Sequence, residues 1–506
     1  MSLINWEASM KSSPHPSLFG RALLALLLTI GFYGLALTIA FGLLYLIYLE
    51  FAVVGRVNIR FTIFGFIGAV VILWSILPRI DRFTAPGPRL TRTKFPALFK
   101  EIEKIAKLTG QEMPRDVYLV PDVNAFVAER GGVMGIGTRR VMGIGLPPFN
   151  LMTVDELNAV LAHEFGHFYG GDTALGPWVY KTRSAIVRTV VNLGQTNQWI
   201  QIPFDAYARL FLRVTNSISR QQEFSADQLA ARTVGARATI TGLQKVHKYG
   251  EAFAAYFRQE YIPVIGAGYQ PPMIDGFELF LKAPKVTAAV NNYYNQQLTQ
   301  GKSDPYDTHP ALKERIAALE NIPAGTSIND ALASSLLPHD EDLESQVVNH
   351  ILVENKKPLN LRDVDWEDVV EVAFVPQWEK SIPPYKNILN GITPLSLYAE
   401  AQNILMLFER LAAAGKILPP NVKPYQVPKD AQVQLINNVI GSALAYALRQ
   451  NGWRIKTNPG EDLVFVKGEK EIRPFNIFLH LVLQESSKEQ WQAFCEENNI
   501  GNISLA

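Results

Sequence analysis

The segment LAHEFGHFYGGD, residues 161–172, carries the residue types and the spacing that metal-dependent hydrolysis requires. His163 and His167 are four positions apart, so on a helix they lie on one face and can direct ring nitrogens at one point. Neutral imidazole is a good zinc ligand. Glu164 lies beside the metal, where its carboxylate can take a proton from metal-bound water. The pattern predicts one Zn²⁺ per chain, with Glu164 as the general base.

A catalytic zinc usually has three protein ligands and a water, so a third ligand must come from elsewhere in the chain. Glu223 in RQQEFSAD is the candidate, and Asp227 follows it four residues later on the same helix face. A metal-bound histidine usually donates its other ring N–H to a carboxylate or carbonyl, which is a suitable role for Asp227. The alternative is a solvated helix face that carries two acids.

Length and composition limit the class of protein. A chain of 506 residues is long enough for several structural units. Its net charge of +1 gives no support to a nucleic-acid partner. The single cysteine, Cys495, excludes disulfides within the chain and thiolate zinc sites.

Two apolar runs predict an N-terminal region, residues 1–82, that enters the lipid bilayer as a hairpin. Residues 22–49 carry no charge and exceed the roughly 20 residues that a transmembrane helix needs. Residues 61–78 are at the short end of the spanning range, and a buried core helix is the alternative there. Charged residues interrupt every apolar run in residues 174–222, so we expect no third span between the two motifs.

Basic residues predict the orientation of this hairpin. Lysine and arginine are retained on the cytoplasmic side of a membrane. Seven of them flank the two ends of the hairpin, against two in the loop at residues 50–60. We therefore expect both termini, and the catalytic domain with them, to be cytoplasmic.

The elements that must position the motif can be predicted from local patterns. Thr153 and Glu156 form a Thr-x-x-Glu capping box that begins the motif helix, and Gly170 with Gly171 ends it. The Val-, Ile- and Gly-rich segment before this helix predicts strands. Within it, VMGIGL is expected to be the exposed edge that pairs with substrate, through Val141, Gly143, Ile144 and Gly145. The alternative is that these glycines only shape a hairpin.

Three segments resemble metallopeptidase family 48, which comprises membrane-associated zinc peptidases such as HtpX and the CAAX prenyl proteases. They are ELNAVLAHEFGHFYGGDT, RQQEFSADQLA and DTHPALKERIAALE, in this order, with VNAF upstream. The resemblance covers roughly residues 90–320. It implies that Glu223 is the third zinc ligand and that Asp227 is similar to the acid that orients a zinc histidine in related gluzincins.

The resemblance also implies roles for three further residues. His309 is expected to approach the active site and to stabilise the oxyanion. Arg315 is expected to do the same or to hold its helix. Asp172 matches the family pattern and is expected to cap the helix or to contact the metal-binding side chains without binding the metal. The chain departs from the HtpX pattern in two ways: further apolar spans between the two zinc motifs are not expected here, and the C-terminal region has no counterpart.

The expected fold class is α+β, with a mainly helical, zincin-like metallopeptidase domain at residues 83–325 that contains a small sheet. A small α+β domain of unknown role is expected at residues 340–506. The expected activity is zinc-dependent hydrolysis of unfolded or membrane-associated polypeptides, in membrane-protein quality control at the bacterial inner membrane. The alternative is a catalytically silent, peptidase-like scaffold or binding protein at the membrane. An intramembrane metallopeptidase is disfavoured because charged residues closely flank the motif.

Overall fold

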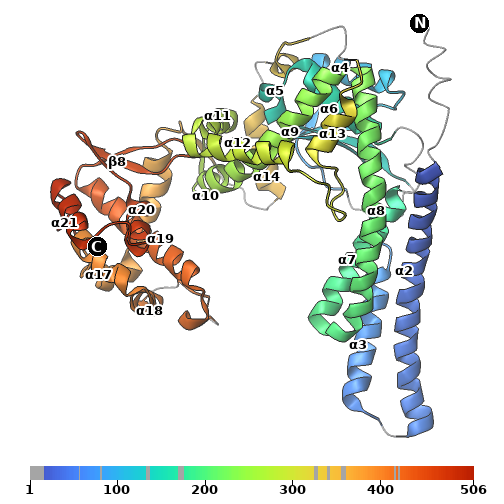
Figure 1. The fold of residues 1–506 in the computed structure, drawn as a ribbon, viewed down its shortest axis with the longest axis horizontal. Helices are drawn as coiled ribbons and strands as arrows, with labels where there is room; N and C mark the ends of the chain where they lie inside the picture. The colour runs from blue at the N-terminus through green and yellow to red at the C-terminus, as the bar shows by residue number, and fades with distance from the viewer. Residues whose placement is uncertain are drawn as a thin grey trace. The chain divides into compact units, whose positions relative to one another are not determined.

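The computed structural model describes residues 16–55, 57–79, 83–132, 137–168, 176–323, 329–338, 342–354, 360–414, 417–419 and 422–506 (Figure 1). The chain forms two compact units. The first unit comprises Met1–Glu251 with Asn291–Asn355, and the second unit comprises Ala252–Val290 with Lys356–Ala506. The predicted, mainly helical α+β architecture is confirmed. The predicted domain boundaries at residues 82, 325 and 340 do not coincide with this division, and they stay predictions.

The N-terminal hairpin consists of α2 (Pro16–Leu49), which continues into the π-helical turn η1 (Glu50–Val54), and α3 (Ile59–Ile76). Two helices in the described part of the chain are long and apolar enough to span a membrane, at Leu23–Val53 and Ile59–Ile76. Their apolar windows are only 28% and 33% buried, which argues against a core helix and favours a lipid environment. Both predicted spans therefore coincide with candidate membrane helices.

Two further helices, α7 (Gly176–Thr196) and α8 (Gln198–Thr233), pack along this hairpin (Figure 1). Phe204 and Phe211 of α8 are fully buried in the shared core, and the rings of Phe204 and Phe32 lie 6.4 Å apart between their centroids. Arg188 of α7 donates two hydrogen bonds to the backbone oxygen of Ser75, at 2.9 and 3.2 Å. Neither α7 nor α8 is among the candidate spans, but both belong to the same helical bundle as the hairpin.

A four-stranded sheet in the first unit has the order β1-β2-β4-β3. β4 (Arg139–Gly145) pairs in parallel with β2 (Asp116–Val120) and in an antiparallel manner with β3 (Ala125–Arg130), while β1 (Arg89–Leu90) lies at the other edge. The predicted substrate edge is therefore wrong. Val141, Gly143 and Ile144 each have a strand partner on both sides. Gly145 pairs with Val120 on one side and donates a hydrogen bond to the backbone oxygen of Asn124 on the other.

The glycines of β4 have a packing role instead. A Cβ atom on Gly143 would lie 2.2 Å from the ring of Phe126, and one on Gly145 would lie 1.8 Å from the backbone oxygen of Asp122. No side chain fits at either position, so the chain can approach closely only because both residues are glycine. The alternative, that these glycines shape the hairpin, agrees with this packing. Among the described strands, β3 lies at the edge of the sheet next to β4, and its outer side pairs with none of them.

The motif helix α6 (Val154–Gly166) begins as predicted. Thr153 accepts a hydrogen bond from the backbone N–H of Glu156, and the Glu156 side chain accepts one from the backbone N–H of Thr153. Lys245 of α9 (Ala236–Tyr256) lies 2.7 Å from the same Glu156 carboxylate. The capping box is confirmed, and it also joins α6 to α9. The predicted helix end at Gly170 and Gly171 lies outside the described residues.

The remaining elements complete the two units. The first unit adds α4 (Pro96–Leu108), α5 (Pro147–Leu151), α13 (Leu312–Leu319), η4 (Ala333–Leu336) and α14 (Leu343–Glu354). The residues of α12 (Pro284–Thr299) are divided between the two units. The second unit contains η3 (Phe257–Tyr261), α10 (Ile262–Gly266), β5 (Tyr269–Gln270), α11 (Met273–Lys282), β6 (Arg362–Asp363), η5 (Val370–Phe374), α15 (Val375–Ser381), η6 (Pro383–Tyr385), α16 (Lys386–Leu389), η7 (Pro394–Ser396), α17 (Leu397–Gln402), α18 (Ile404–Ala414), η8 (Pro424–Gln426), α19 (Lys429–Gln450), β7 (Arg454–Lys456), β8 (Val464–Lys467), β9 (Lys470–Ile472), α20 (Pro474–Val482) and α21 (Lys488–Glu497).

α6 and α8 cross at very close range beside the motif histidines. A Cβ atom on Gly166 would lie 2.8 Å from the Cα atom of Ala226 and 2.9 Å from its Cβ atom. The obstacle includes backbone, which cannot rotate away as a flexible side chain would. This contact sets the distance between the helix that carries the HExxH motif and the helix that carries Glu223.

We expect Gly166→Ala to push α6 and α8 apart and to destabilise the protein by about 1–3 kcal/mol, the usual effect of overpacking. Gly250→Ala is the matched control, because a Cβ atom on Gly250 of α9 meets nothing within 4 Å. Thermal unfolding in detergent should show a lower midpoint for Gly166→Ala than for Gly250→Ala. Equal midpoints would show that the crossing tolerates a methyl group.

Candidate active site

The predicted metal-binding side chains converge where α6 crosses α8. The ligand atoms of His163, Glu164 and His167 lie within 4.8 Å of one another, and the two imidazole rings are 4.8 Å apart between centroids. His163 and Glu164 lie in the last turn of α6, and His167 is its C-cap. Glu223 and Asp227 are buried on the part of α8 that packs against this turn.

The Glu223 carboxylate faces both histidines. Its Oε2 atom lies 3.5 Å from Nε2 of His163, and its Oε1 atom lies 3.6 Å from Nε2 of His167. Oε2 is buried and accepts no hydrogen bond from the residues that the structure describes, although Nη2 of Arg315 lies 3.2 Å away. The guanidinium offsets part of this buried charge, and a cation held between the carboxylate and the two imidazoles would stabilise it further. Two imidazoles and a carboxylate are also a donor set that zinc accepts, so these residues fit a zinc ion.

Arg315 and Asp227 form a buried ion pair behind the histidines. Nε and Nη2 of Arg315 each donate a hydrogen bond of 2.7 Å to Asp227, and the two side chains are only 4% and 2% exposed. Oδ1 of Asp227 lies 2.9 Å from Nδ1 of His163. Asp227 thus engages the Nδ1 side of this ring and leaves Nε2 directed at Glu223.

The charges around this pair decide the protonation of the histidines. Burial would raise the pKa of Asp227, but the hydrogen bonds from Arg315 hold it well below its usual range. Burial would lower the pKa of His163, but the neighbouring Asp227 carboxylate raises it. Burial lowers the pKa of His167 to about 3, helped by the positive charges of His163 and Arg315. His167 is therefore a neutral imidazole at physiological pH, which is the form that binds a metal.

Glu164 extends from the motif helix to strand β3 of the sheet. Burial raises the pKa of Glu164 to about 7, and the negative charge of Glu223 adds to this effect. The backbone N–H of Val127, in β3, donates a hydrogen bond to its carboxylate. A carboxyl group that titrates near neutral pH can both accept and return a proton. Sequence patterns do not indicate Val127, because this residue contributes only its backbone.

His309 reaches the same carboxylate from the loop before α13. Its Nε2 atom lies 3.4 Å from Oε1 of Glu223, and its side chain is 57% exposed. The loop is held by α8, where Arg220 donates hydrogen bonds to the backbone oxygens of three loop residues and Asn216 donates one more at 2.6 Å. Sequence reasoning missed Arg220 and Asn216, because their partners are backbone atoms about 90 residues away.

The structure brings most of the predicted site residues together, but not all of them. His163, Glu164, His167, Glu223 and Asp227 form one cluster with His309 and Arg315. Asp172 lies outside the described residues. The four residues predicted to bind substrate lie within the sheet and present no free backbone edge, as shown above.

Comparison with known proteins agrees with this geometry. The chain matches peptidase family M48 over residues 92–323. It is similar to Protease HtpX of Haemophilus influenzae (strain PittGG), with 27% identity over 53% of this chain and 89% of the relative. The HtpX of strain PittEE is 30% identical over 39% of this chain and 76% of the relative, and that of Idiomarina loihiensis is 28% identical over 38% and 71%. No solved structure matches the chain. On these similarities and the motifs that they contain, the chain belongs to peptidase family M48.

Proposed function

We propose that this chain is a zinc endopeptidase anchored in the membrane, a refinement of the membrane-associated metalloprotease that its family and relatives support. The observation that carries the proposal is the Glu223 carboxylate, whose two oxygens face the Nε2 atoms of His163 and His167. These three residues would hold one Zn²⁺, and Glu164 lies beside them. The set matches three protein ligands plus a base, which is what water activation requires.

Each side chain has a distinct task in peptide hydrolysis. When bound, zinc would polarise the scissile carbonyl and would lower the pKa of a water molecule toward about 7. Glu164 takes the proton of that water on its carboxylate and returns it to the leaving amine. His309 lies at the exposed rim, where its Nε2–H can donate to the developing oxyanion. Arg315 acts through Asp227, which keeps His163 in its orientation.

The open edge of β3 is the proposed binding surface for the substrate backbone. Val127 directs its N–H away from β4 and toward Glu164. Because residues two apart in a strand direct their backbone groups the same way, alternate residues of β3 would present theirs at this outer edge. An extended polypeptide that pairs with such an edge is held by main-chain hydrogen bonds, whatever its side chains. This mode suits unfolded or membrane-associated polypeptides, and a role in membrane-protein quality control.

We further propose that the protein lies in the bacterial inner membrane with its catalytic domain in the cytoplasm. The support is the excess of basic residues at the two ends of the hairpin over its loop, seven against two. The second candidate function, a catalytically silent scaffold at the membrane, has less support because Glu164 is present and lies in the cluster.

Removal of the third ligand should release the metal. We expect Glu223→Ala to retain less than about one tenth of the zinc of the wild type, since two imidazoles alone bind zinc weakly. The control is Glu320→Ala, which removes an exposed carboxylate at the end of α13. Metal analysis of the purified proteins measures the effect, and full zinc content in Glu223→Ala would exclude Glu223 as a ligand.

Removal of the base should separate catalysis from metal binding. Glu164→Gln keeps the shape of the side chain but cannot accept a proton, so we expect one zinc per chain and a loss of activity of about 10²–10⁴-fold. Casein zymography with Glu320→Gln as the control measures this. Near-normal turnover would mean that another group is the base. If the wild type itself binds zinc but cleaves nothing, the scaffold alternative is correct.

The orientation can be tested with single cysteines. Val57 is 42% exposed in the hairpin loop, and Leu108 is 50% exposed at the end of α4. The native Cys495 is fully buried and provides an unreactive background. An impermeant thiol reagent added to intact cells should label Val57→Cys and leave Leu108→Cys unlabelled until the membrane is opened. Labelling of Leu108→Cys but not of Val57→Cys in intact cells would show that the opposite topology is correct.

A further inference from the structure

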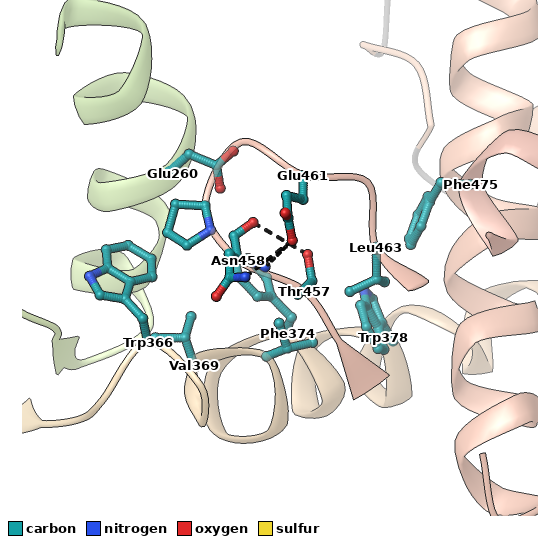
Figure 2. Close-up of a pocket in the computed structure, with 12 residues that line it drawn as sticks. Glu260, Trp366, Val369, Phe374, Trp378, Thr457, Asn458, Glu461, Leu463 and Phe475 are labelled. Atoms are coloured by element: carbon teal, nitrogen blue, oxygen red, sulfur yellow. Dashed lines mark hydrogen bonds between the residues drawn. The ribbon is translucent and has the colours of Figure 1, made fainter. Parts of the chain in front are cut away.

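A pocket in the second unit belongs to no part of the peptidase site. It lies where η3, η5 and the loop at residues 457–463 meet, and its volume is about 230 Å³ (Figure 2). Most of its lining residues follow residue 323, where the match to family M48 ends. Pockets that take a whole drug-sized ligand usually measure about 300–1,000 Å³. This pocket is smaller and suits a single side chain.

Aromatic rings form much of the pocket wall. Trp366 and Trp378 line it and are each 9% exposed, and Phe374 lies between them in the view of Figure 2. The face of an aromatic ring carries partial negative charge and attracts a cation placed over it. Among the aromatic side chains, the indole of tryptophan attracts a cation most strongly. Two tryptophans in one small pocket therefore favour a cationic ligand.

Two carboxylates lie across the pocket from these rings in Figure 2. Glu260 accepts a hydrogen bond from the backbone N–H of Gly460 at 3.3 Å. Glu461 accepts two from Asn458, one from its backbone N–H at 3.1 Å and one from Nδ2 at 3.2 Å. Among the described residues, no lysine, arginine or histidine forms an ion pair with either carboxylate. Burial also raises the pKa of Glu260, which shows that its ionised form is poorly solvated.

The pocket is built from defined backbone features. Glu260 belongs to η3 and Phe374 to η5, and both segments are π-helical turns, a rare conformation that is frequent at functional sites. Gly460 has a φ of +80°, and a Cβ atom there would lie 2.8 Å from the ring of Phe280. The loop that carries Glu461 is therefore packed onto α11. Lys285 fixes the same loop through Asp462, at 2.6 Å.

We propose that this pocket binds the side chain of an arginine or lysine residue in a polypeptide. The rings would cover the apolar stem and face the charge, and the two carboxylates would accept its N–H groups. A quaternary ammonium group has no N–H to donate and would leave both carboxylates without hydrogen bonds from the ligand. Guanidinium fits best, because it is flat, stacks on indole and donates in several directions. The choice of a polypeptide as ligand rests on the proposed peptidase function.

Bound in this way, a basic side chain would tether a polypeptide to the second unit by a contact separate from the zinc centre. On the proposed function, the edge of β3 would hold a substrate through its backbone and would not choose among sequences. A pocket for a basic residue would add such a choice, and it would raise the local concentration of polypeptides that carry one.

A direct binding measurement tests this without relying on catalysis. Full-length Glu164→Gln protein in detergent is titrated with N-acetyl-arginine methylamide, and binding is followed by ligand-observed NMR. N-acetyl-citrulline methylamide, which has nearly the same shape but no charge, is the first comparison. We expect the arginine compound to bind about tenfold more tightly or better, as charge-assisted hydrogen bonds to carboxylates predict.

Variants of the pocket complete the test. The double variant Glu260→Gln with Glu461→Gln should weaken binding of the arginine compound about tenfold or more. Glu461→Gln alone should weaken its binding about threefold. Glu461 is exposed, so its single variant guards against misfolding, and Glu409→Gln on the exposed face of α18 is the matched control. Equal binding of arginine and citrulline compounds, no effect of the double substitution, or tighter binding of choline would each overturn the proposal. Arginine binding by a protein that cleaves nothing would leave the pocket intact and reject only the peptidase function.

Discussion

The buried ion pair between Arg315 and Asp227 is the interaction on which the metal centre depends. Two hydrogen bonds of 2.7 Å join these side chains, and both are almost inaccessible to water. Loss of one partner would leave an uncompensated buried charge, which typically costs about 3–5 kcal/mol. The pair therefore fixes α13 against α8. Through Asp227 it orients His163, and through the contact of 3.2 Å with Glu223 it places the carboxylate that faces both imidazoles.

α8 connects this centre to the helices of the N-terminal hairpin. It is a single helix of 36 residues, roughly 54 Å long at 1.5 Å per residue. Phe204 and Phe211 near its start are buried against α2, α3 and α7, while Glu223 and Asp227 near its end face the motif helix. One continuous helix thus carries residues of the apolar bundle and of the metal centre.

Much of the metal centre could be predicted from the sequence, because its signals are local. The spacing of His163 and His167, the capping box at Thr153 and the i, i+4 pair of acids on α8 each depend on one helix only. The apolar runs of the hairpin were equally clear. The resemblance to family M48 was needed for His309 and Arg315, which are distant in sequence from the motif and have no local pattern.

The features that the sequence did not reveal depend on contacts between distant segments. The glycines of β4 predict that another group approaches the backbone closely. They do not indicate whether a substrate or Phe126 occupies the space beside Gly143. The strand order places β4 between β2 and β3, and a parallel pairing of this kind has no local signature. Likewise, nothing in the local sequence distinguishes Gly166 from other helix residues. In the structure, a Cβ atom at this position would lie 2.8 Å from the Cα atom of Ala226.

In the proposed metal centre, the crossing of α6 and α8 assembles a zinc site from two imidazoles and one carboxylate. X-ray absorption spectroscopy of the zinc-loaded protein tests it most directly, because the spectrum counts ligands by type. We expect two imidazole ligands, oxygen in the remaining positions at about 2.0–2.2 Å, and no sulfur. A spectrum with a sulfur ligand, or with fewer than two imidazoles, would contradict the account.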